Sequence, residues 1–122
     1  MLEIPVSPGE VADRITILRI KSARLGDPDE RAFAQLRSLE LEKRLQLPKH
    51  LEGHLESLQS INEALWEAED RVRSLDAAGS FGEEFTGVAR SIYRLNDERH
   101  AIKKALDGAL GFQTEGKSLP DY

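Results

Sequence analysis

The fold is decided by residues 54–106, which read HLESLQSINEALWEAEDRVRSLDAAGSFGEEFTGVARSIYRLNDERHAIKKAL. On either side of Ala78-Gly79-Ser80, largely apolar positions recur every three or four residues, as in two amphipathic helices joined by a short turn. One stripe comprises His54, Leu58, Ile61, Leu65, Ala68, Val72 and Leu75, and the other Leu106, Ile102, Arg99, Leu95, Ile92, Val88 and Phe85. These stripes predict where the two helices meet.

The two stripes are in mirror register along the chain. Helices joined by a short turn run antiparallel, so residues at the same height have numbers that add to one constant. Leu65 with Leu95 and Leu58 with Ile102 obey this rule, as do the other stripe positions. We therefore predict a long helical hairpin, with arms of roughly 40 Å at 1.5 Å per residue.

The N-terminal part of the chain begins with a clear helix start. Ser7 and Glu10 form a capping box, and Pro8 suits the first helical position, where its missing N–H is not needed. A first helix is expected over about 8–25, closed by Gly26. Its predicted core positions are Val11, Ile15, Leu18 and Leu25.

A second helix is expected over about 28–46. Asp27-Pro28 repeats the capping pattern that begins the first helix. Its predicted core positions are Ala32, Phe33, Leu36, Leu39 and Leu41. The predicted facing pairs of this shorter hairpin are Leu18 with Leu36 and Ile15 with Leu39.

The two arms of the long hairpin are expected over about 50–78 and 81–110. A Ser80-x-x-Glu83 box would begin the second arm, and Gly111 would cap its end. Residues 111–122 form a tail that could fold back through Phe112, Leu119 and Tyr122. Together these elements predict an all-α antiparallel four-helix bundle with a short extended N-terminal segment and a C-terminal tail.

Length and composition limit the function classes. The 122 residues favour a single helical domain over 1–122, with a core that needs no disulfide or metal. The chain has no cysteine, which excludes thiolate metal sites and a cysteine nucleophile. The net charge of −5 argues against a nucleic-acid partner, and no apolar run is long enough to span a membrane. We expect a cytoplasmic protein without a cofactor.

The first predicted helix is apolar on two sides. Ile17 and Ile20 lie away from the face that carries Ile15 and Leu18. Such a helix is either central in the bundle or part of an interface. We expect a homodimer, with Ile17 and Ile20 as its candidate contact.

A polar and aromatic patch is expected on one side of the long hairpin. The height rule brings Trp66 near Tyr93, Glu69 near Arg90, and Asn62 near Asn96 or Asp97. The first helix could supply a third wall through Asp13, Arg14 and Lys21. Such a patch can be a binding site or the ordinary edge of a core, where polar tips satisfy one another. The candidate ligand-binding residues are Asn62, Trp66, Glu69, Arg90, Tyr93, Asn96 and Arg99.

Arg99 is anomalous because it occupies the core stripe. Its guanidinium stays charged and needs an anion or a path to water. Glu69, Asp70, the carboxylate of Tyr122 or an acidic ligand could serve as that anion. An ion pair inside the bundle is the simpler interpretation.

Metal-binding patterns are weak. His50 and His54 share a helix face but lack the glutamate of the metalloprotease motif. A di-iron bundle requires two Glu-x-x-His pairs and two further glutamates, of which this chain offers only Asp97-x-x-His100. Glu67-x-x-Asp70 is similar to the magnesium motif of all-helical nucleotide pyrophosphatases, without a second upstream acidic motif. We expect no metal site.

The sequence resembles a family of short bacterial proteins known only as a domain of unknown function. The resemblance rests on residues 5–10 and 13–21, on Asn62-Glu63-Ala64-Leu65-Trp66 with Glu69-Asp70, and on Tyr93, Asn96-Asp97 and Arg99. It implies no activity, so no catalytic role is carried over. It does imply a natural bacterial protein.

Three functions remain compatible with the sequence. The first is a non-enzymatic module that binds a protein or an acidic small molecule through the candidate residues. The second is a magnesium-dependent enzyme on nucleotides or phosphosugars, with Glu67, Asp70 and Asp97 holding the metal. The third is a structural scaffold without a pocket.

Overall fold

The computed structural model describes residues 1–112, which contain four α-helices and no strand. The helices are α1 (Pro8–Arg24), α2 (Pro28–Leu45), α3 (Glu52–Ala77) and α4 (Glu83–Ala109), and a 3-10 turn, η1 (Lys49–Leu51), precedes α3. The all-α prediction is confirmed, and the predicted ends agree to within about two residues, the usual uncertainty of helix boundaries. The expectations for Leu119 and Tyr122 lie outside the described residues.

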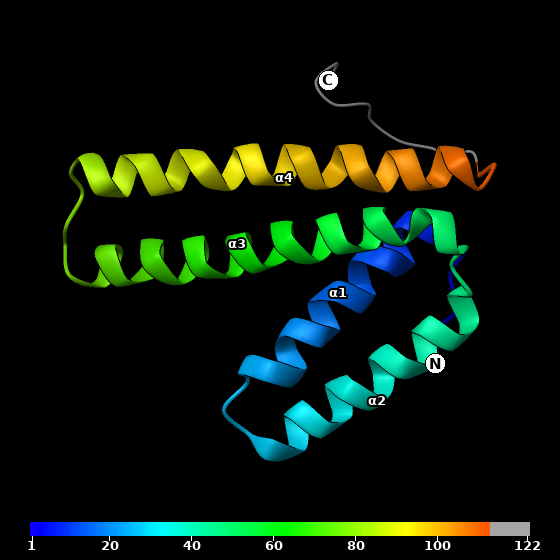
Figure 1. Cartoon of the computed structure of the whole chain (residues 1–122). Helices are drawn as coiled ribbons and strands as arrows, with labels where there is room; N and C mark the ends of the chain where they lie inside the picture. The colour runs from blue at the N-terminus through cyan, green and yellow to red at the C-terminus, as the bar shows by residue number, and fades with distance from the viewer. Residues whose placement is uncertain (113–122) are drawn as a thin grey trace.

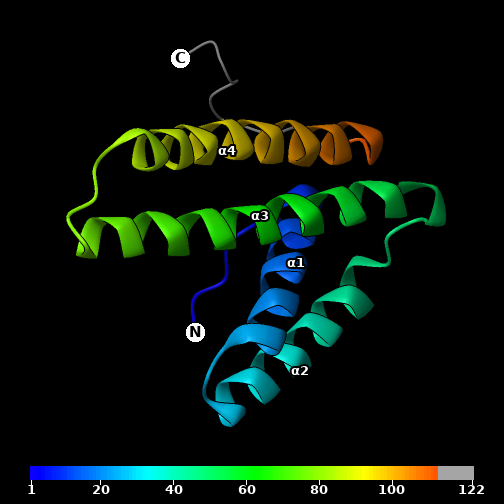
Figure 2. The ribbon, with the colours of Figure 1, turned by 60° about the vertical axis from the view of Figure 1, so that its left-hand side comes forward.

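The helices form two hairpins of unequal length, joined through α1 (Figures 1 and 2). α3 and α4 run antiparallel as the long hairpin, and α1 and α2 form the shorter one. α1 packs against all three other helices, whereas α2 packs chiefly along α1 and diverges from the long hairpin. α1 is therefore the central helix, one of the two roles that its apolar faces predict.

The N-cap residues of the shorter hairpin are the predicted ones, Ser7 and Asp27, although the Glu10 carboxylate of the predicted capping box is paired with Lys103. The Ser7 hydroxyl accepts a hydrogen bond from the Glu10 N–H at 3.1 Å, and the Asp27 carboxylate accepts one from the Asp29 N–H at 2.8 Å. Gly26, however, is not a left-handed cap. The chain leaves α1 at Leu25 in an extended conformation, with φ −63° and ψ 144°. The Arg31 guanidinium donates to the carbonyls of Leu25 and Gly26 instead.

Glycines close both arms of the long hairpin. Gly79 and Gly111 adopt φ values of 66° and 70°, which favour glycine because it lacks a Cβ. The predicted Ser80 capping box is wrong: Gly82 is the N-cap of α4, and its helix start has no side-chain cap. The Ser80 N–H instead donates to the Leu75 carbonyl at 2.8 Å, which closes the end of α3.

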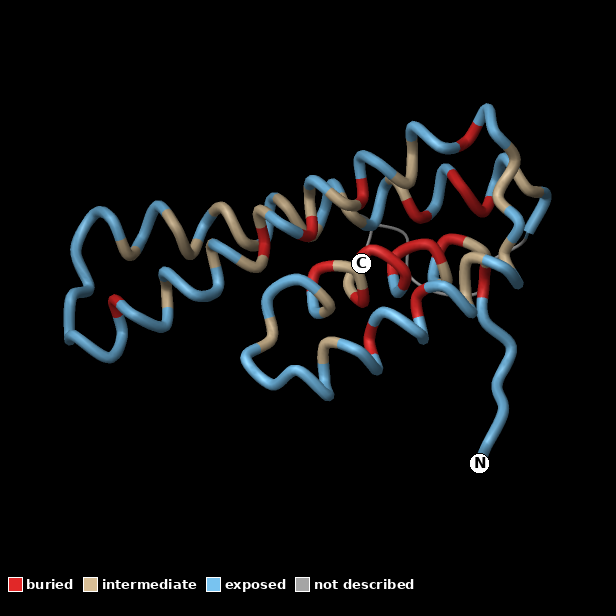
Figure 3. The backbone as a smooth tube through the Cα atoms, turned by 60° about the horizontal axis from the view of Figure 1, so that its bottom comes forward, coloured by how far each residue is buried: buried red, intermediate tan, exposed pale blue. Residues whose placement is uncertain are grey.

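The core follows the two predicted stripes. Every position of both stripes in α3 and α4 is buried or half-buried. Buried residues concentrate along α1 and along the part of the long hairpin that it contacts, and become sparse toward the far turn (Figure 3). The buried apolar cluster of this region comprises Ala12, Leu51, Leu58 and Leu106, one each from α1, η1, α3 and α4.

The predicted packing face of α2 is wrong. Leu36 and Leu39 are 70% and 54% exposed, so they do not face Leu18 and Ile15. Ala34 and Ser38 are the buried residues of α2, because small side chains let the two helices approach closely. The predicted core positions Ala32 and Phe33 are likewise exposed, and only Leu41 is half-buried.

The predicted dimer contact is partly covered within the protomer. Ile20 is only 3% exposed and Ile17 is half-buried. The physical reason is the central position of α1, which packs against all three other helices. Ile20 is therefore not available to a second copy.

Within residues 1–112, no helix combines the length and the apolar character that a membrane crossing requires.

Candidate functional site

A buried polar cluster lies where α1 crosses α3 and α4. We define the polar cluster as Glu10, Asp13, Thr16, Asn62, Arg99 and Lys103. Asp13, Thr16 and Asn62 are at most 5% exposed. The Asn62 amide donates from Nδ2 to Asp13 Oδ1 at 2.9 Å and to Thr16 Oγ1 at 2.8 Å. The α3 amide thus satisfies two oxygens that α1 carries into the interior.

Two cations from α4 surround the same carboxylate. Arg99 Nε lies 3.8 Å from Asp13 Oδ1, and Lys103 Nζ lies 3.9 Å from Asp13 Oδ2. Lys103 also donates a hydrogen bond to the Glu10 carboxylate at the edge of the cluster. That bond, above all, holds the pKa of Glu10 below its usual value, against the opposing effect of its partial burial.

The backbone of α1 touches α4 beside the polar cluster. The Gly9 N–H donates to Asp107 Oδ1 at 2.7 Å, in a buried bond that joins the two ends of the described chain. A Cβ at position 9 would lie only 2.4 Å from the Lys103 carbonyl oxygen. Glycine is therefore needed here for close approach, because any side chain would push the helices apart.

The polar cluster is charge-compensated within itself. Glu10 and Asp13 contribute two carboxylates, and Arg99 and Lys103 contribute two cations. Removing either side would leave a poorly solvated charge, so the arrangement fixes one docking geometry of α1. Its hydrogen bonds and ion pairs link the shorter hairpin, through α1, to the long hairpin.

The candidate residues predicted from sequence divide into three groups. Asn62 and Arg99 belong to the polar cluster, and Trp66 and Asn96 are half-buried. Glu69, Arg90 and Tyr93 are exposed. Glu69 lies 3.9 Å from Arg73 on its own helix.

Tyr93 lies in a basic environment on the surface of α4. The Arg94 guanidinium lies 5.9 Å from the centre of the Tyr93 ring. Hydrogen bonding and charge from Arg94, with a smaller effect of Arg90, lower the pKa of the Tyr93 phenol.

The proposed third wall is only partly present. Asp13 is buried in the polar cluster, whereas Arg14 and Lys21 are exposed. Asp13 is also the anion that accompanies Arg99, in the role predicted for Glu69, Asp70 or Tyr122. Arg99 therefore forms an ion pair inside the bundle, as the simpler interpretation predicted, and its partner is on α1.

Sequence reasoning missed the other half of the polar cluster. The sequence assigns Glu10 only to a helix cap and does not single out Thr16 or Lys103 as site residues, nor Asp107 beside the polar cluster. One signal was available: Thr16 interrupts an apolar run at the position next to Ile15. The link from Gly9 to Asp107 left no local signal, because its partners lie 98 residues apart.

Metal-ligating side chains do not converge in the described part of the chain. Among residues 1–112, no three His, Asp or Glu side chains form a group that could hold a metal ion. Glu67 is paired with Arg24 at 3.1 Å, and Glu67, Asp70 and Asp97 do not form such a group.

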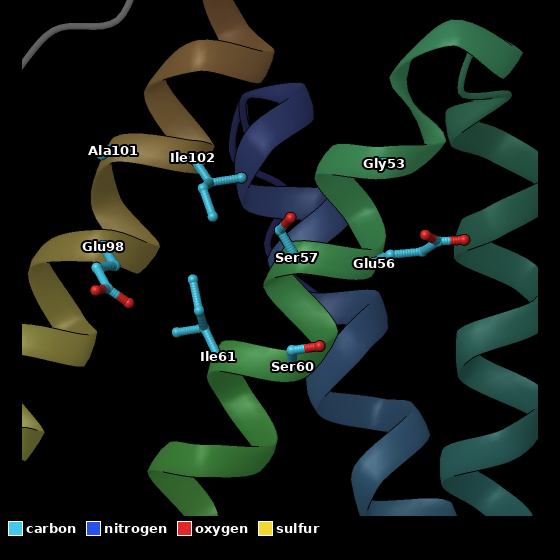
Figure 4. Close-up of a pocket in the computed structure, with 8 residues that line it drawn as sticks. All are labelled: Gly53, Glu56, Ser57, Ser60, Ile61, Glu98, Ala101 and Ile102. Atoms are coloured by element: carbon cyan, nitrogen blue, oxygen red, sulfur yellow. The ribbon is translucent and has the colours of Figure 1, made fainter.

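A shallow groove lies between α3 and α4, with α1 behind the two helices (Figure 4). Ile61 and Ile102 form its apolar part, and Ser57, Ser60, Glu56 and Glu98 are among its polar residues. No basic side chain lines it, so it has no feature that would attract an acidic ligand.

Comparison with protein families identifies a match. A family of unknown function, DUF6165, matches residues 2–112, which include all four helices and the polar cluster. No curated protein and no solved structure shows significant similarity to the sequence. Since the match covers most of the sequence, the chain belongs to this family of unknown function, DUF6165.

Proposed function

We propose that the protein is a non-enzymatic protein-interaction module that binds through the outer face of α2. We define this outer face by Phe33, Leu36 and Leu39. The observation that carries the proposal is their exposure, which is 67%, 70% and 54%.

The outer face of α2 stands out because of what α2 buries instead. Ala34 and Ser38 are the buried residues of α2, whereas Phe33, Leu36 and Leu39 are exposed large apolar side chains; Leu41 and Leu45 are half-buried. Burying one such side chain stabilises a complex by up to about 1.5–3 kcal/mol. An apolar stripe on a helix is a common recognition element when a partner covers it.

The polar cluster supports a non-enzymatic role by its bonding. Asn62, Asp13 and Thr16 use their polar atoms on one another, and Lys103 is engaged by Glu10 and Asp13. Polar groups that bond one another in this way hold α1 against the long hairpin. The position of α1 in turn sets the position of α2.

The wild-type chain and Leu36→Glu are each immobilised on a solid support and incubated with an extract of the source organism. The test compares the proteins that each of them binds. We expect at least one protein to bind the wild type and not Leu36→Glu. The matched control is Phe81→Glu, because Phe81 is 59% exposed but lies at the turn of the long hairpin. Identical binding by wild type and Leu36→Glu would contradict a docking role for α2.

A second candidate function is binding of an acidic small molecule at the candidate residues around Arg99. One observation favours it: the buried Arg99 Nε has no hydrogen-bond partner, although Asp13 is nearby. Citrate and inorganic phosphate are suitable probes. Under this candidate, citrate raises the melting temperature of the wild type but not of Arg99→Gln. An equal shift in both proteins would eliminate it.

A further inference from the structure

We infer that the partner of the outer face of α2 is a second copy of the chain, paired antiparallel about a twofold axis at Leu36. This inference rests on the proposed function and names its partner. The dimer contact predicted from the sequence was Ile17 and Ile20, but Ile20 is buried within the protomer. The outer face of α2 is a different surface.

The outer face is symmetric about Leu36. Asp29 and Lys43 lie seven residues before and after Leu36, which places all three on one line along the helix. Phe33 and Leu39 lie three residues to either side. In an antiparallel pair centred on Leu36, Phe33 faces Leu39 of the partner subunit, and Asp29 faces Lys43 of the partner subunit. The apolar contacts are thus flanked by two symmetry-related ion pairs.

The charges of α2 select the antiparallel orientation. Its first turn carries Asp29 and Glu30, and its last turn carries Lys43 and Arg44. An antiparallel pair places acidic turns against basic turns and also opposes the two helix dipoles, whereas a parallel pair would bring like charges together. Within residues 1–112, neither Asp29 nor Lys43 takes part in an ion pair, so both charges are available.

The position of α2 leaves room for a second copy. α2 forms the outer edge of the shorter hairpin and diverges from α3 and α4 (Figures 1 and 2). Its opposite side is already packed on α1. A single helix face is small compared with the interfaces of permanent dimers, so we expect a reversible, concentration-dependent dimer.

The first test is sedimentation equilibrium of the full chain over a range of concentrations. The wild type should shift from monomer toward dimer as concentration rises, and Leu36→Glu should stay monomeric. Because Leu36 is 70% exposed, the variant should keep its helical circular dichroism. Phe81→Glu is the control and should dimerise like the wild type. A monomeric wild type up to its solubility limit, or an unchanged Leu36→Glu dimer, would overturn the inference.

The second test examines the orientation through charge exchange. Asp29→Lys should weaken the dimer, because it places lysine against lysine twice. Adding Lys43→Asp to the same chain should restore the dimer, because the exchanged charges again face each other. If the double variant is weaker than Asp29→Lys, or if Asp29→Lys dimerises like the wild type, the antiparallel arrangement is wrong.

The two proposals fail in distinguishable ways. If the wild type is monomeric but an extract protein still requires Leu36, the second copy is ruled out and the interaction role survives. If the wild type is monomeric and no protein requires Leu36, both proposals fail.

Discussion

The carboxylate of Asp13 contacts side chains from both arms of the long hairpin. It accepts a hydrogen bond from Asn62 and lies within 4 Å of two cations from α4. Asp13→Ala should therefore leave Arg99 and Lys103 without their shared counter-charge. Loss of one member of a buried ion pair typically costs about 3–5 kcal/mol. We expect a loss near that range in urea unfolding, whereas Asp97→Ala, at an exposed position, should change stability little.

Glu10 makes a smaller contribution that depends on pH. Its pKa is lower in the folded protein, mainly because Lys103 donates a hydrogen bond to it. The contribution is therefore complete above the unfolded pKa of Glu10 and is lost as pH falls through the folded pKa. Glu10→Gln should be less stable than the wild type at neutral pH by under about 1 kcal/mol, since the side chain is half exposed.

The measurement for Glu10 is the stability difference between the two proteins across pH. This difference should disappear in acid, below the folded pKa of Glu10. A difference that stays constant through that range would show that Glu10 acts through packing and not through its charge.

At the scale of elements, the contact of α1 with α4 depends on the absence of a side chain at position 9. Gly9→Ala would place a Cβ against the Lys103 carbonyl, so α1 would have to shift. We expect a loss of stability of about 1–3 kcal/mol, the usual cost of overpacking. The matched control is Gly87→Ala in α4, where a Cβ meets nothing within 4 Å.

Thermal unfolding distinguishes the two glycines. Gly87→Ala should raise the melting temperature, because alanine favours the helix by about 0.5–1 kcal/mol. Gly9→Ala should lower it. Equal effects in the same direction would mean that helix propensity, and not close approach, governs position 9.

Prediction from sequence worked for elements whose pattern is redundant. The α3 and α4 stripes are each seven positions long. Their agreement in register therefore left few alternative alignments of the two helices. The α2 pattern lacked this redundancy. Apolar residues at the spacing of Phe33, Leu36 and Leu39 are expected both on a face that packs on α1 and on a face that binds a partner. Only the burial of Ala34 and Ser38 shows which face α1 occupies. Bonds such as Gly9 to Asp107 depend on tertiary packing and cannot be found from local sequence patterns.

At the scale of the whole molecule, the polar cluster determines what remains exposed. It fixes α1 across the long hairpin, and α1 in turn holds α2 at the outer edge (Figure 2). The Arg19 guanidinium and the Glu42 carboxylate form an ion pair that helps to keep α2 on α1. The outer face of α2 is therefore presented by a rigid support, which limits the entropy lost when a partner binds.

The most direct measurement of self-association through α2 is disulfide cross-linking, which the cysteine-free chain makes unambiguous. Phe33→Cys and Leu39→Cys are prepared as separate chains and oxidised alone and as a mixture. Antiparallel pairing about Leu36 predicts that the mixture forms linked dimers faster than either chain alone, because positions 33 and 39 face each other. Faster linking of each chain with itself would indicate parallel pairing, and no linking above the rate of an exposed Thr86→Cys control would contradict pairing through α2.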